Sequence, residues 1–293
     1  MPIAFLVLAL GVATLLVVPF WKAGAAFINN ANWLAAKLLL FVIKAFALLP
    51  GGHIYVEVPR LAAAPGCEFT VLDLRDGGAI HLRSGGSDWL LDCGSSFDYG
   101  RTVLPFLRSR GVNRLDGLLL THGDTHHIGG ALAALDDFHP RSVVDSPLQD
   151  RSPTRAQLHA ELATRRLGKA ICARGDFIRI APQASLRVLF PPAGLKRSAA
   201  DDKALVLQLE SAGTRVLFMS DSGFNTEQWL LENEPDLRSD ILVKGHHAKD
   251  LSGTLEFLAR VQPQAGLWRN ACAGRRAAQG FKGASPLARA VVA

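Results

Sequence analysis

The stretch Thr121-His122-Gly123-Asp124-Thr125-His126-His127-Ile128-Gly129-Gly130 carries the strongest evidence for the fold of this chain. It gathers three histidines and one aspartate within six residues, directly after the apolar run 118–120. Polar groups of this kind are costly to collect beside a buried strand unless they bind something. Imidazole and carboxylate ligands together suit a divalent cation such as zinc or manganese. The stretch therefore predicts a metal site at the end of a strand.

The same arrangement occurs twice more along the chain. The apolar run 216–219 ends in Ser220 and Asp221, and the run 241–244 ends in Gly245, His246 and His247. Ligands that follow several buried strands meet at one edge of a sheet although they lie far apart in sequence. The pattern predicts one site assembled from both halves of the chain.

The N-terminal fifth of the chain is unusually apolar. Residues 3–20 contain no charged side chain, and this segment is long enough for a short membrane span. Residues 33–49 form a second apolar stretch, but Lys37 and Lys44 lie seven residues apart on one helical face. That spacing favours an interfacial or bundle-facing helix. We expect residues 1–50 to anchor the chain in the cell (inner) membrane.

A cleaved signal peptide is the alternative interpretation of this segment. Ala23-Gly24-Ala25 resembles a small-residue cleavage site. No basic residue precedes the first apolar run, however, and a second apolar stretch follows it. These flanks favour a membrane anchor, whereas Lys22 alone between the segments does not orient it.

Charge and cysteine content give weaker indications. The net charge of +6 over 293 residues favours an anionic partner such as nucleic acid, phosphate or a lipid surface. Much of the excess lies after residue 265, so we expect residues 266–293 to be a basic, disordered tail. The four cysteines include no Cys-x-x-Cys pair, so they are expected to be structural thiols. The alternative is that two of them form one disulfide outside the cytoplasm.

Residues 51–66 are expected to be a linker, because Pro and Gly recur there, and residues 67–265 a single domain. Short apolar runs alternate with helical patterns in this domain, which predicts an α/β layered architecture. The expected strands are 69–73, 79–83, 88–92, 117–120, 141–145, 177–180, 186–190, 204–210, 215–219 and 241–244, and the expected helices 101–110, 129–135, 154–166, 226–232 and 254–261. The chain contains neither a Gly-x-x-x-x-Gly-Lys phosphate loop nor a Gly-x-Ser-x-Gly elbow.

The run Leu120-Thr121-His122-x-Asp124-x-x-His127-Ile128-Gly129-Gly130 resembles the metal-binding loop of the metallo-β-lactamase superfamily. The loop has an aspartate at the second ligand position, and in this it resembles the corresponding loop in the soluble domain of the ComEC family of DNA-uptake channels. Five further segments resemble that family in order and spacing: 69–80, 89–94, 201–210, 217–221 and 241–247. The resemblance covers roughly residues 30 to 265 and implies an αββα sandwich preceded by one or two membrane helices.

The resemblance also implies a two-metal site holding zinc or manganese. His122 and Asp124 would hold one ion, His127 and His246 the other, and Asp221 would bridge them. Catalysis through metal-bound water would depend on Asp124 and Asp221, with His126 as an additional ligand. Substrate contacts or residues supporting the ligands are expected among Asp73, Asp92, Asp202, Lys203, His247 and Lys249.

The sequence departs from the family pattern at four places. His126 replaces an aspartate, Gly78 replaces an aspartate at a glycine turn, Ser220 replaces a glycine, and residues 248–249 replace Gly-Ser. An imidazole at position 126 removes a formal charge from the second ion and favours zinc over manganese.

Three functions remain open at this point. The first is a membrane-tethered phosphodiesterase acting on single- or double-stranded DNA during competence. The second is a non-catalytic module that binds DNA at a channel, and the third is a metallo-hydrolase of a small substrate. The family's channel is missing apart from its last one or two helices. The implied partners are therefore DNA, the membrane and a separate channel subunit or the remainder of the channel. The domain is expected on the extracytoplasmic side.

Overall fold

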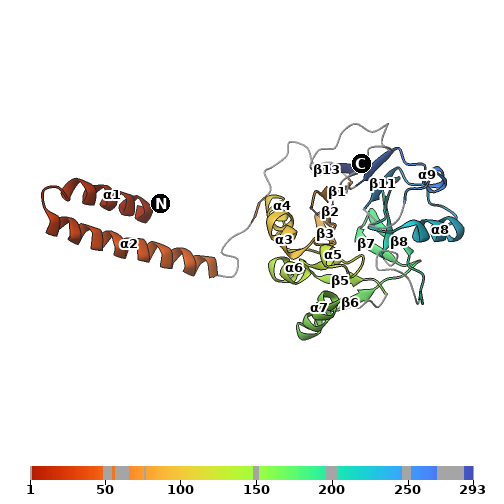
Figure 1. Ribbon diagram of the computed structural model, residues 1–293, viewed down its shortest axis with the longest axis horizontal. Helices are drawn as coiled ribbons and strands as arrows, with labels where there is room; N and C mark the ends of the chain where they lie inside the picture. The colour runs from red at the N-terminus through yellow and green to blue at the C-terminus, as the bar shows by residue number, and fades with distance from the viewer. Residues whose placement is uncertain are drawn as a thin grey trace. The chain divides into compact units, whose positions relative to one another are not determined.

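The computed structural model describes residues 2–48, 55–56, 66–75, 77–147, 152–195, 204–245, 252–268 and 287–292. Its contacts divide the chain into two compact units, Met1–Ile54 and Tyr55–Ala293 (Figure 1). Each unit has its own architecture.

The N-terminal unit is a pair of helices, α1 (Pro2–Val17) and α2 (Lys22–Leu48), that pack against each other. α2 has 27 residues and a length of about 40 Å, more than the hydrocarbon core of a bilayer, about 30 Å. α1 has 16 residues and a length of about 24 Å, which is less than the thickness of the hydrocarbon core. Among the described residues, the helical segment long and apolar enough to cross a membrane is Lys22–Ala45. This differs from the expected assignment, in which residues 3–20 spanned the bilayer and 33–49 lay at its interface.

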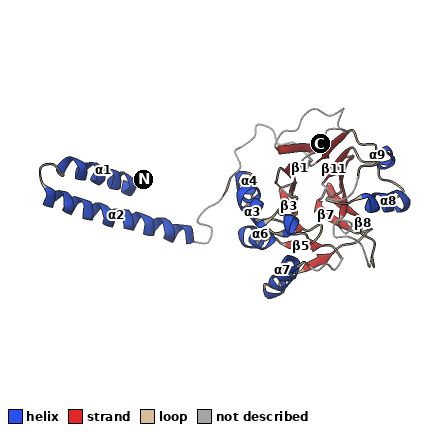
Figure 2. Ribbon diagram, in the orientation of Figure 1, coloured by secondary structure: helices blue, strands red, loops and turns tan. Residues whose placement is uncertain are grey.

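The C-terminal unit contains two β-sheets among its described residues (Figure 2). The first sheet has the strand order β13-β1-β2-β3-β4-β5-β6 and the second β12-β11-β10-β9-β8-β7. The strands of the first are β1 (Cys67–Leu72), β2 (Ile80–Ser84), β3 (Ser87–Leu91), β4 (Gly117–Leu119), β5 (Ser142–Asp145), β6 (Lys169–Ile171) and β13 (Leu287–Val292). Those of the second are β7 (Phe177–Ala181), β8 (Ala184–Phe190), β9 (Val206–Ser211), β10 (Thr214–Phe218), β11 (Ile241–Lys244) and β12 (Ala265–Trp268).

Helices cover the outer faces of both sheets, as Figure 2 shows. The first sheet is covered by α3 (Ser96–Asp98), the π-helical turn η1 (Tyr99–Val103), α4 (Leu104–Ser109), α5 (Thr125–Ile128), α6 (Ala131–Phe138) and α7 (Pro153–Thr164). The second is covered by α8 (Phe224–Asn233) and α9 (Leu255–Val261).

Three hydrophobic clusters separate the four layers. In β10, Val216 and Phe218 enter the core between the sheets, whereas Leu217 packs against α8 and α9. In β4, Leu119 enters the same central core and Leu118 packs outward under the helices. This alternation follows from the two-residue period of a strand. The four-layer arrangement confirms the predicted αββα sandwich.

The end of the chain differs from the expected disordered tail. Residues 265–268 form β12 beside β11, and residues 287–292 form β13 beside β1. Edge strands with unpaired backbone groups readily accept another strand, which gives the Leu-Ala-Arg-Ala-Val-Val segment a place in the sheet.

The carboxyl ends of several strands converge where the two sheets meet. β3, β4 and β5 run parallel in the first sheet, and β10 and β11 run parallel in the second. The Leu205 amide donates a 2.9 Å hydrogen bond to the Thr121 carbonyl, which joins the two sheets at this edge. Side chains that follow these strands are thereby brought together.

Candidate metal centre

Asp92 follows β3 and supports the segment that follows β4. Its Oδ1 accepts a 2.8 Å hydrogen bond from the Thr121 amide, and its Oδ2 accepts one of 2.6 Å from the Thr121 hydroxyl. Asp92 is buried and has a φ of 55°, a left-handed conformation that is costly for a residue other than glycine. Backbone strain of this kind occurs where surrounding interactions hold a functional side chain in place.

His127, on α5, lies between two carboxylates. Its Nδ1 is 2.7 Å from Asp92 Oδ2, and its Nε2 is 2.9 Å from Asp221 Oδ2. Asp221 follows β10, so these contacts connect both halves of the sandwich through one imidazole. The ring is buried, which shields the contacts from water.

The Thr121 hydroxyl determines which nitrogen of His122 carries a proton. Its own hydrogen is donated to Asp92, so it accepts from His122 Nδ1 at 3.0 Å. The neutral His122 ring therefore presents a lone pair at Nε2. That atom is buried and has no hydrogen-bond partner. A buried, unpartnered imidazole nitrogen is what a metal ligand requires.

Ser220 completes the junction from the second sheet. Its Oγ lies 2.9 Å from Thr121 Oγ1, and its φ of 47° is again left-handed. Gly245, after β11, donates its amide to the Ser220 carbonyl at 2.7 Å. A Cβ at position 245 would overlap Asp221 Oδ1, so only glycine allows β11 to approach this closely.

The two histidines titrate in opposite directions. Burial, followed by the charge of His127, lowers the pKa of His122 to about 4. Burial alone would also lower the pKa of His127, but Asp92 and Asp221 together outweigh it and raise this pKa to about 10. In the metal-free protein at neutral pH, His122 is neutral, whereas His127 is protonated and donates from Nδ1 to Asp92 and from Nε2 to Asp221.

These residues fit a divalent cation. His122 and His127 stack at a ring-centroid distance of 4.2 Å, and ligand atoms of Asp92, His122 and His127 lie within 4.8 Å of one another. Asp92 already accepts three hydrogen bonds, two from Thr121 and one from His127. It is therefore better placed to orient His127 than to bind an ion. The groups that could hold the cation are then His122 Nε2, His127 Nε2 and the Asp221 carboxylate.

The other expected site residues have different positions. Asp124 is half-buried and caps α5, because its Oδ1 accepts from the His126 amide at 2.8 Å. His126 is exposed on the same helix, and Asp73 is exposed after β1. Asp202, Lys203, His246, His247 and Lys249 lie outside the described residues. Their roles as ligands or substrate contacts stay predictions.

Thr121 and the pair Lys244–Glu227 are structural supports that sequence patterns did not indicate. Lys244 is buried just before Gly245; its Nζ donates to the Ser222 carbonyl at 2.6 Å and lies 3.1 Å from Glu227 Oε1. Glu227 also accepts from the Gly253 and Thr254 amides. The pair thus ties the residues beside Asp221 to the start of α9. The sequence indicates this pair only through Lys244, a charged residue at the end of the apolar run 241–244.

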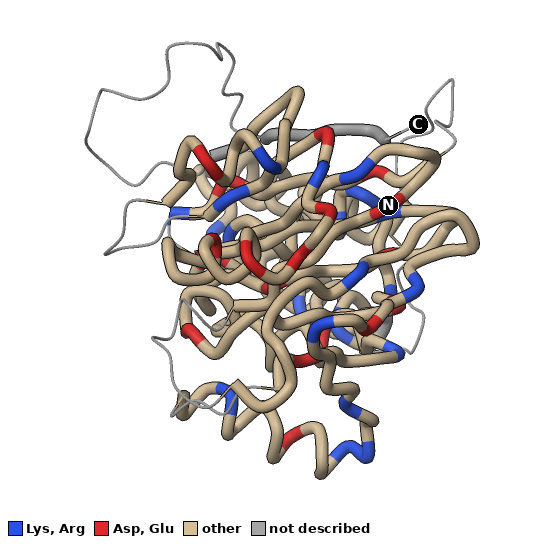
Figure 3. Tube along the Cα trace, turned by 90° about the vertical axis from the view of Figure 1, so that its right-hand side faces the viewer, with Lys and Arg blue, Asp and Glu red and all other residues tan. Residues whose placement is uncertain are grey.

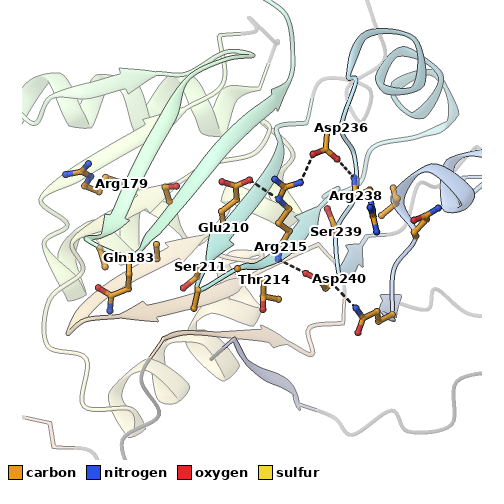
Figure 4. Close-up of a pocket in the computed structure, with 18 of the residues that line it drawn as sticks. Arg179, Gln183, Glu210, Ser211, Thr214, Arg215, Asp236, Arg238, Ser239 and Asp240 are labelled. Carbon is orange, nitrogen blue, oxygen red and sulfur yellow. Dashed lines mark hydrogen bonds and ion pairs between the residues drawn. The ribbon is translucent and has the colours of Figure 1, made fainter.

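A pocket of about 720 Å³ lies elsewhere in the second sheet (Figure 4). It surrounds the turn between β9 and β10 and so lies at the amino end of β10, opposite the end that carries Asp221. Its central cation, Arg215, pairs with Glu210 at 3.1 Å and Asp236 at 2.6 Å. The pocket is consequently separate from the metal centre. Three cysteines, Cys67, Cys93 and Cys172, are buried and free, whereas Cys272 lies outside the described residues.

The chain is similar in sequence to proteins of known family. The Metallo-beta-lactamase superfamily model matches residues 78–194. ComE operon protein 3 of Bacillus subtilis (strain 168) is 32% identical over 177 residues, covering 57% of this chain and 22% of that protein. Competence protein ComA of Neisseria gonorrhoeae is 25% identical over 239 residues, covering 78% of this chain and 31% of that protein. The chain thus spans less than a third of the length of either of these relatives.

Among solved structures, the metallo-beta-lactamase fold protein YhfI from Bacillus subtilis superimposes with a TM-score of 0.48 and 13% identity. The match covers 69% of this chain and 85% of YhfI. Residues 78–194 therefore match the metallo-β-lactamase superfamily, and the chain is similar to two competence proteins, ComE operon protein 3 and ComA.

Proposed function

We propose that this protein is a membrane-tethered, metal-dependent phosphodiesterase that cleaves DNA during uptake. The observation that carries the proposal is the buried, unpartnered Nε2 of His122 beside His127 and Asp221. A hydrolase of this superfamily needs such a nitrogen to bind its cation. The competence proteins to which the chain is similar suggest DNA as the substrate.

In this proposal, His122, His127 and Asp221 hold a divalent cation. When bound, such an ion polarises a phosphoryl oxygen and activates water for attack. Asp92 holds His127 through Nδ1, so that Nε2 faces the cation site. Thr121 does the same for His122. The imidazoles are buried, and this excludes bulk water from the side of the site that faces the core.

The remaining expected ligands, Asp124, His126 and His246, would hold a second cation. This grouping differs from the one that the resemblance implies, in which Asp124 accompanies His122 and His246 accompanies His127, because the His122 and His127 rings stack at 4.2 Å. The half-buried carboxylate of Asp124 caps α5 with Oδ1 and retains Oδ2 for a metal. The imidazole at position 126 favours zinc over manganese at this position. At the first cation site, the two nitrogen donors and one carboxylate fit zinc or manganese.

Tethering is assigned to α2, whose segment Lys22–Ala45 is long and apolar enough to cross a bilayer. The domain would then act on DNA beside a channel, supplied by a separate subunit or by the remainder of a longer protein. We place this site on the extracytoplasmic side of the cell membrane. Removal of residues 1–54 should move the protein from the membrane to the soluble fraction of a cell lysate.

Two alternatives use the same fold. A non-catalytic module would bind DNA without turnover, and a small-substrate hydrolase would accept an acyl ester. To separate them, the full chain in detergent is loaded with zinc or manganese and tested on bis(4-nitrophenyl) phosphate, an acyl ester and an oligonucleotide. We expect hydrolysis of the phosphodiester and the oligonucleotide. Turnover of the ester alone, or DNA binding without any turnover, would refute the proposal.

A further inference from the structure

Phe97, on α3, is an exposed aromatic side chain accompanied by two arginines. Its side chain is 51% exposed, in a domain that buries most of its large apolar residues. The Arg75 guanidinium carbon lies 4.8 Å from the ring centroid, and that of Arg101 lies 5.8 Å from it. Arg75, Phe97 and Arg101 are called the Phe97 patch below.

The two arginines have no carboxylate partner among the described residues. Most arginines of the domain are paired; Arg83 contacts Asp88, Arg110 contacts Glu68 and Arg174 contacts Glu234. Basic and acidic residues are interspersed along the trace in Figure 3, so net charge alone does not mark a surface for DNA. Two guanidiniums around one exposed ring, neither of them paired with a carboxylate in the part of the chain that the structure describes, are a more specific feature.

The patch borders the segment that carries the metal ligands. α3 packs against α5, and a Cβ at Gly129 would lie 2.9 Å from the Ser96 amide, next to Phe97. On the other side, a Cβ at Gly77 would overlap the His126 carbonyl, and Gly77 lies two residues after Arg75. The Cys93 amide also donates to the His127 carbonyl at 2.7 Å. Both chain segments that carry the patch therefore touch α5.

We propose that the Phe97 patch binds single-stranded DNA beside the metal centre, with one base stacked on Phe97 and neighbouring phosphates held by Arg75 and Arg101. This inference rests on the proposed function, because it takes DNA as the substrate. An exposed aromatic ring stacks with any base, and arginines add salt-sensitive contacts to the backbone. The combination predicts binding of unpaired strands with little sequence preference.

The patch also explains how a strand would be positioned for cleavage. A base held on α3 places the adjoining phosphates next to α5, where His126 and His127 lie. Duplex bases are stacked on one another and cannot reach Phe97 without unpairing. Single strands should therefore bind better than duplexes of the same length.

The test uses the full chain in detergent and fluorescence anisotropy of two labelled probes: a thymidine oligonucleotide and an abasic oligomer of equal length. Phe97→Ala should weaken binding of the thymidine oligonucleotide on the order of tenfold and leave binding of the abasic oligomer unchanged. Phe97→Trp should retain the wild-type affinity. Arg75→Ala with Arg101→Ala should weaken both probes and reduce the dependence of affinity on salt.

Phe177→Ala and Arg179→Ala are the matched controls, since both residues are exposed on β7, away from α3. Neither should change either affinity. Equal affinity of Phe97→Ala and wild type for thymidine, an equal loss on both probes, or no DNA binding by wild type would overturn the inference. Loss of binding to phosphatidylglycerol vesicles in place of DNA would overturn it too and assign the patch to the membrane.

Turnover of bis(4-nitrophenyl) phosphate separates this inference from the proposed function. If wild type hydrolyses the small diester while Phe97→Ala binds DNA normally, the patch is refuted and the phosphodiesterase stands. If wild type hydrolyses nothing but binds DNA in a Phe97-dependent manner, the patch stands and the phosphodiesterase is refuted.

Discussion

The hydroxyls of Thr121 and Ser220 lie 2.9 Å apart although 99 residues separate them in the chain. Thr121 follows β4 of the first sheet, and Ser220 follows β10 of the second. Because Thr121 also contacts Asp92 and His122, one hydroxyl connects the two sheets to the candidate metal ligands. The geometry of the site therefore depends on how the two sheets pack.

Removing the Thr121 hydroxyl should weaken metal binding. Thr121→Val keeps the shape of the side chain but leaves His122 Nδ1 without an acceptor and Asp92 with one donor fewer. Losses of contacts that support ligands usually reduce metal affinity about 10- to 100-fold. Zinc affinity, measured by competition with a chelating dye, should fall by this amount. Thr121→Ser retains the hydroxyl and should bind zinc like wild type; an equal loss in both variants would contradict the assigned role.

Ser220 allows the hydrogen bond and the backbone strain to be separated. Ser220→Gly and Ser220→Ala both remove the contact with Thr121, but only glycine accepts the φ of 47° without steric cost. We expect the alanine variant to be less stable than the glycine variant by about 1 kcal/mol. Urea unfolding measures this difference. Zinc affinity should fall to the same extent in both variants, and equal stabilities would show that the backbone is not strained there.

Metal binding should release one proton from the site. Asp92 and Asp221 raise the pKa of His127 to about 10, and a cation must displace that proton from Nε2. His122, whose pKa is lowered to about 4, is already neutral and releases none. Zinc titration calorimetry at about pH 8, in buffers of different ionisation enthalpy, should report one proton per first ion bound. A value near zero would contradict this arrangement.

The same proton sets the pH dependence of the metal-free fold. Because the folded-state pKa of His127 is raised, its contribution to stability is fully present below the unfolded value of about 6.5. It is lost as the pH rises through about 10. Urea unfolding of the metal-free protein should therefore show declining stability across this window, more steeply than in His127→Gln.

The buried pair Lys244–Glu227 should be costly to break from one side only. Lys244→Met leaves the Glu227 carboxylate buried and uncompensated, a change that usually costs about 3–5 kcal/mol. Adding Glu227→Gln removes the charge but keeps an acceptor for the Gly253 and Thr254 amides. We expect the double variant to unfold at a higher urea concentration than Lys244→Met. If the loss of unfolding free energy in the double variant equals the sum of the losses in Lys244→Met and Glu227→Gln, the two groups do not interact.

The layered fold was predictable because it depends on local patterns. The continuous apolar runs 216–219 and 117–120 identify strands with two buried faces, and both strands occur where expected. The loop of residues 121–130 indicated a ligand cluster because its polar groups directly follow a buried strand. The structure brings His122, His127 and Asp221 together.

Other features depend on contacts that no local pattern encodes. The role of Thr121 follows from hydrogen bonds to Asp92 and Ser220, which are 29 and 99 residues away. The pairing of β13 with β1 joins the two ends of the domain, so an Ala- and Arg-rich segment alone predicts a disordered tail. The helix that is long enough to cross a membrane differs from the expected one, because α2 begins at Lys22, before the apolar stretch 33–49.

The most direct test of the account is cleavage of end-labelled single- and double-stranded DNA by the full chain with zinc or manganese, beside Asp221→Ala. The control is Asp136→Ala, which removes an exposed aspartate from α6. Bound metal and folding are measured on the same samples. The account predicts metal-dependent cleavage by wild type and Asp136→Ala, and at least a hundredfold loss in a folded Asp221→Ala protein, on the order reported for groups that act directly in catalysis. Undiminished cleavage by Asp221→Ala, or none by folded, metal-loaded wild type, would contradict it.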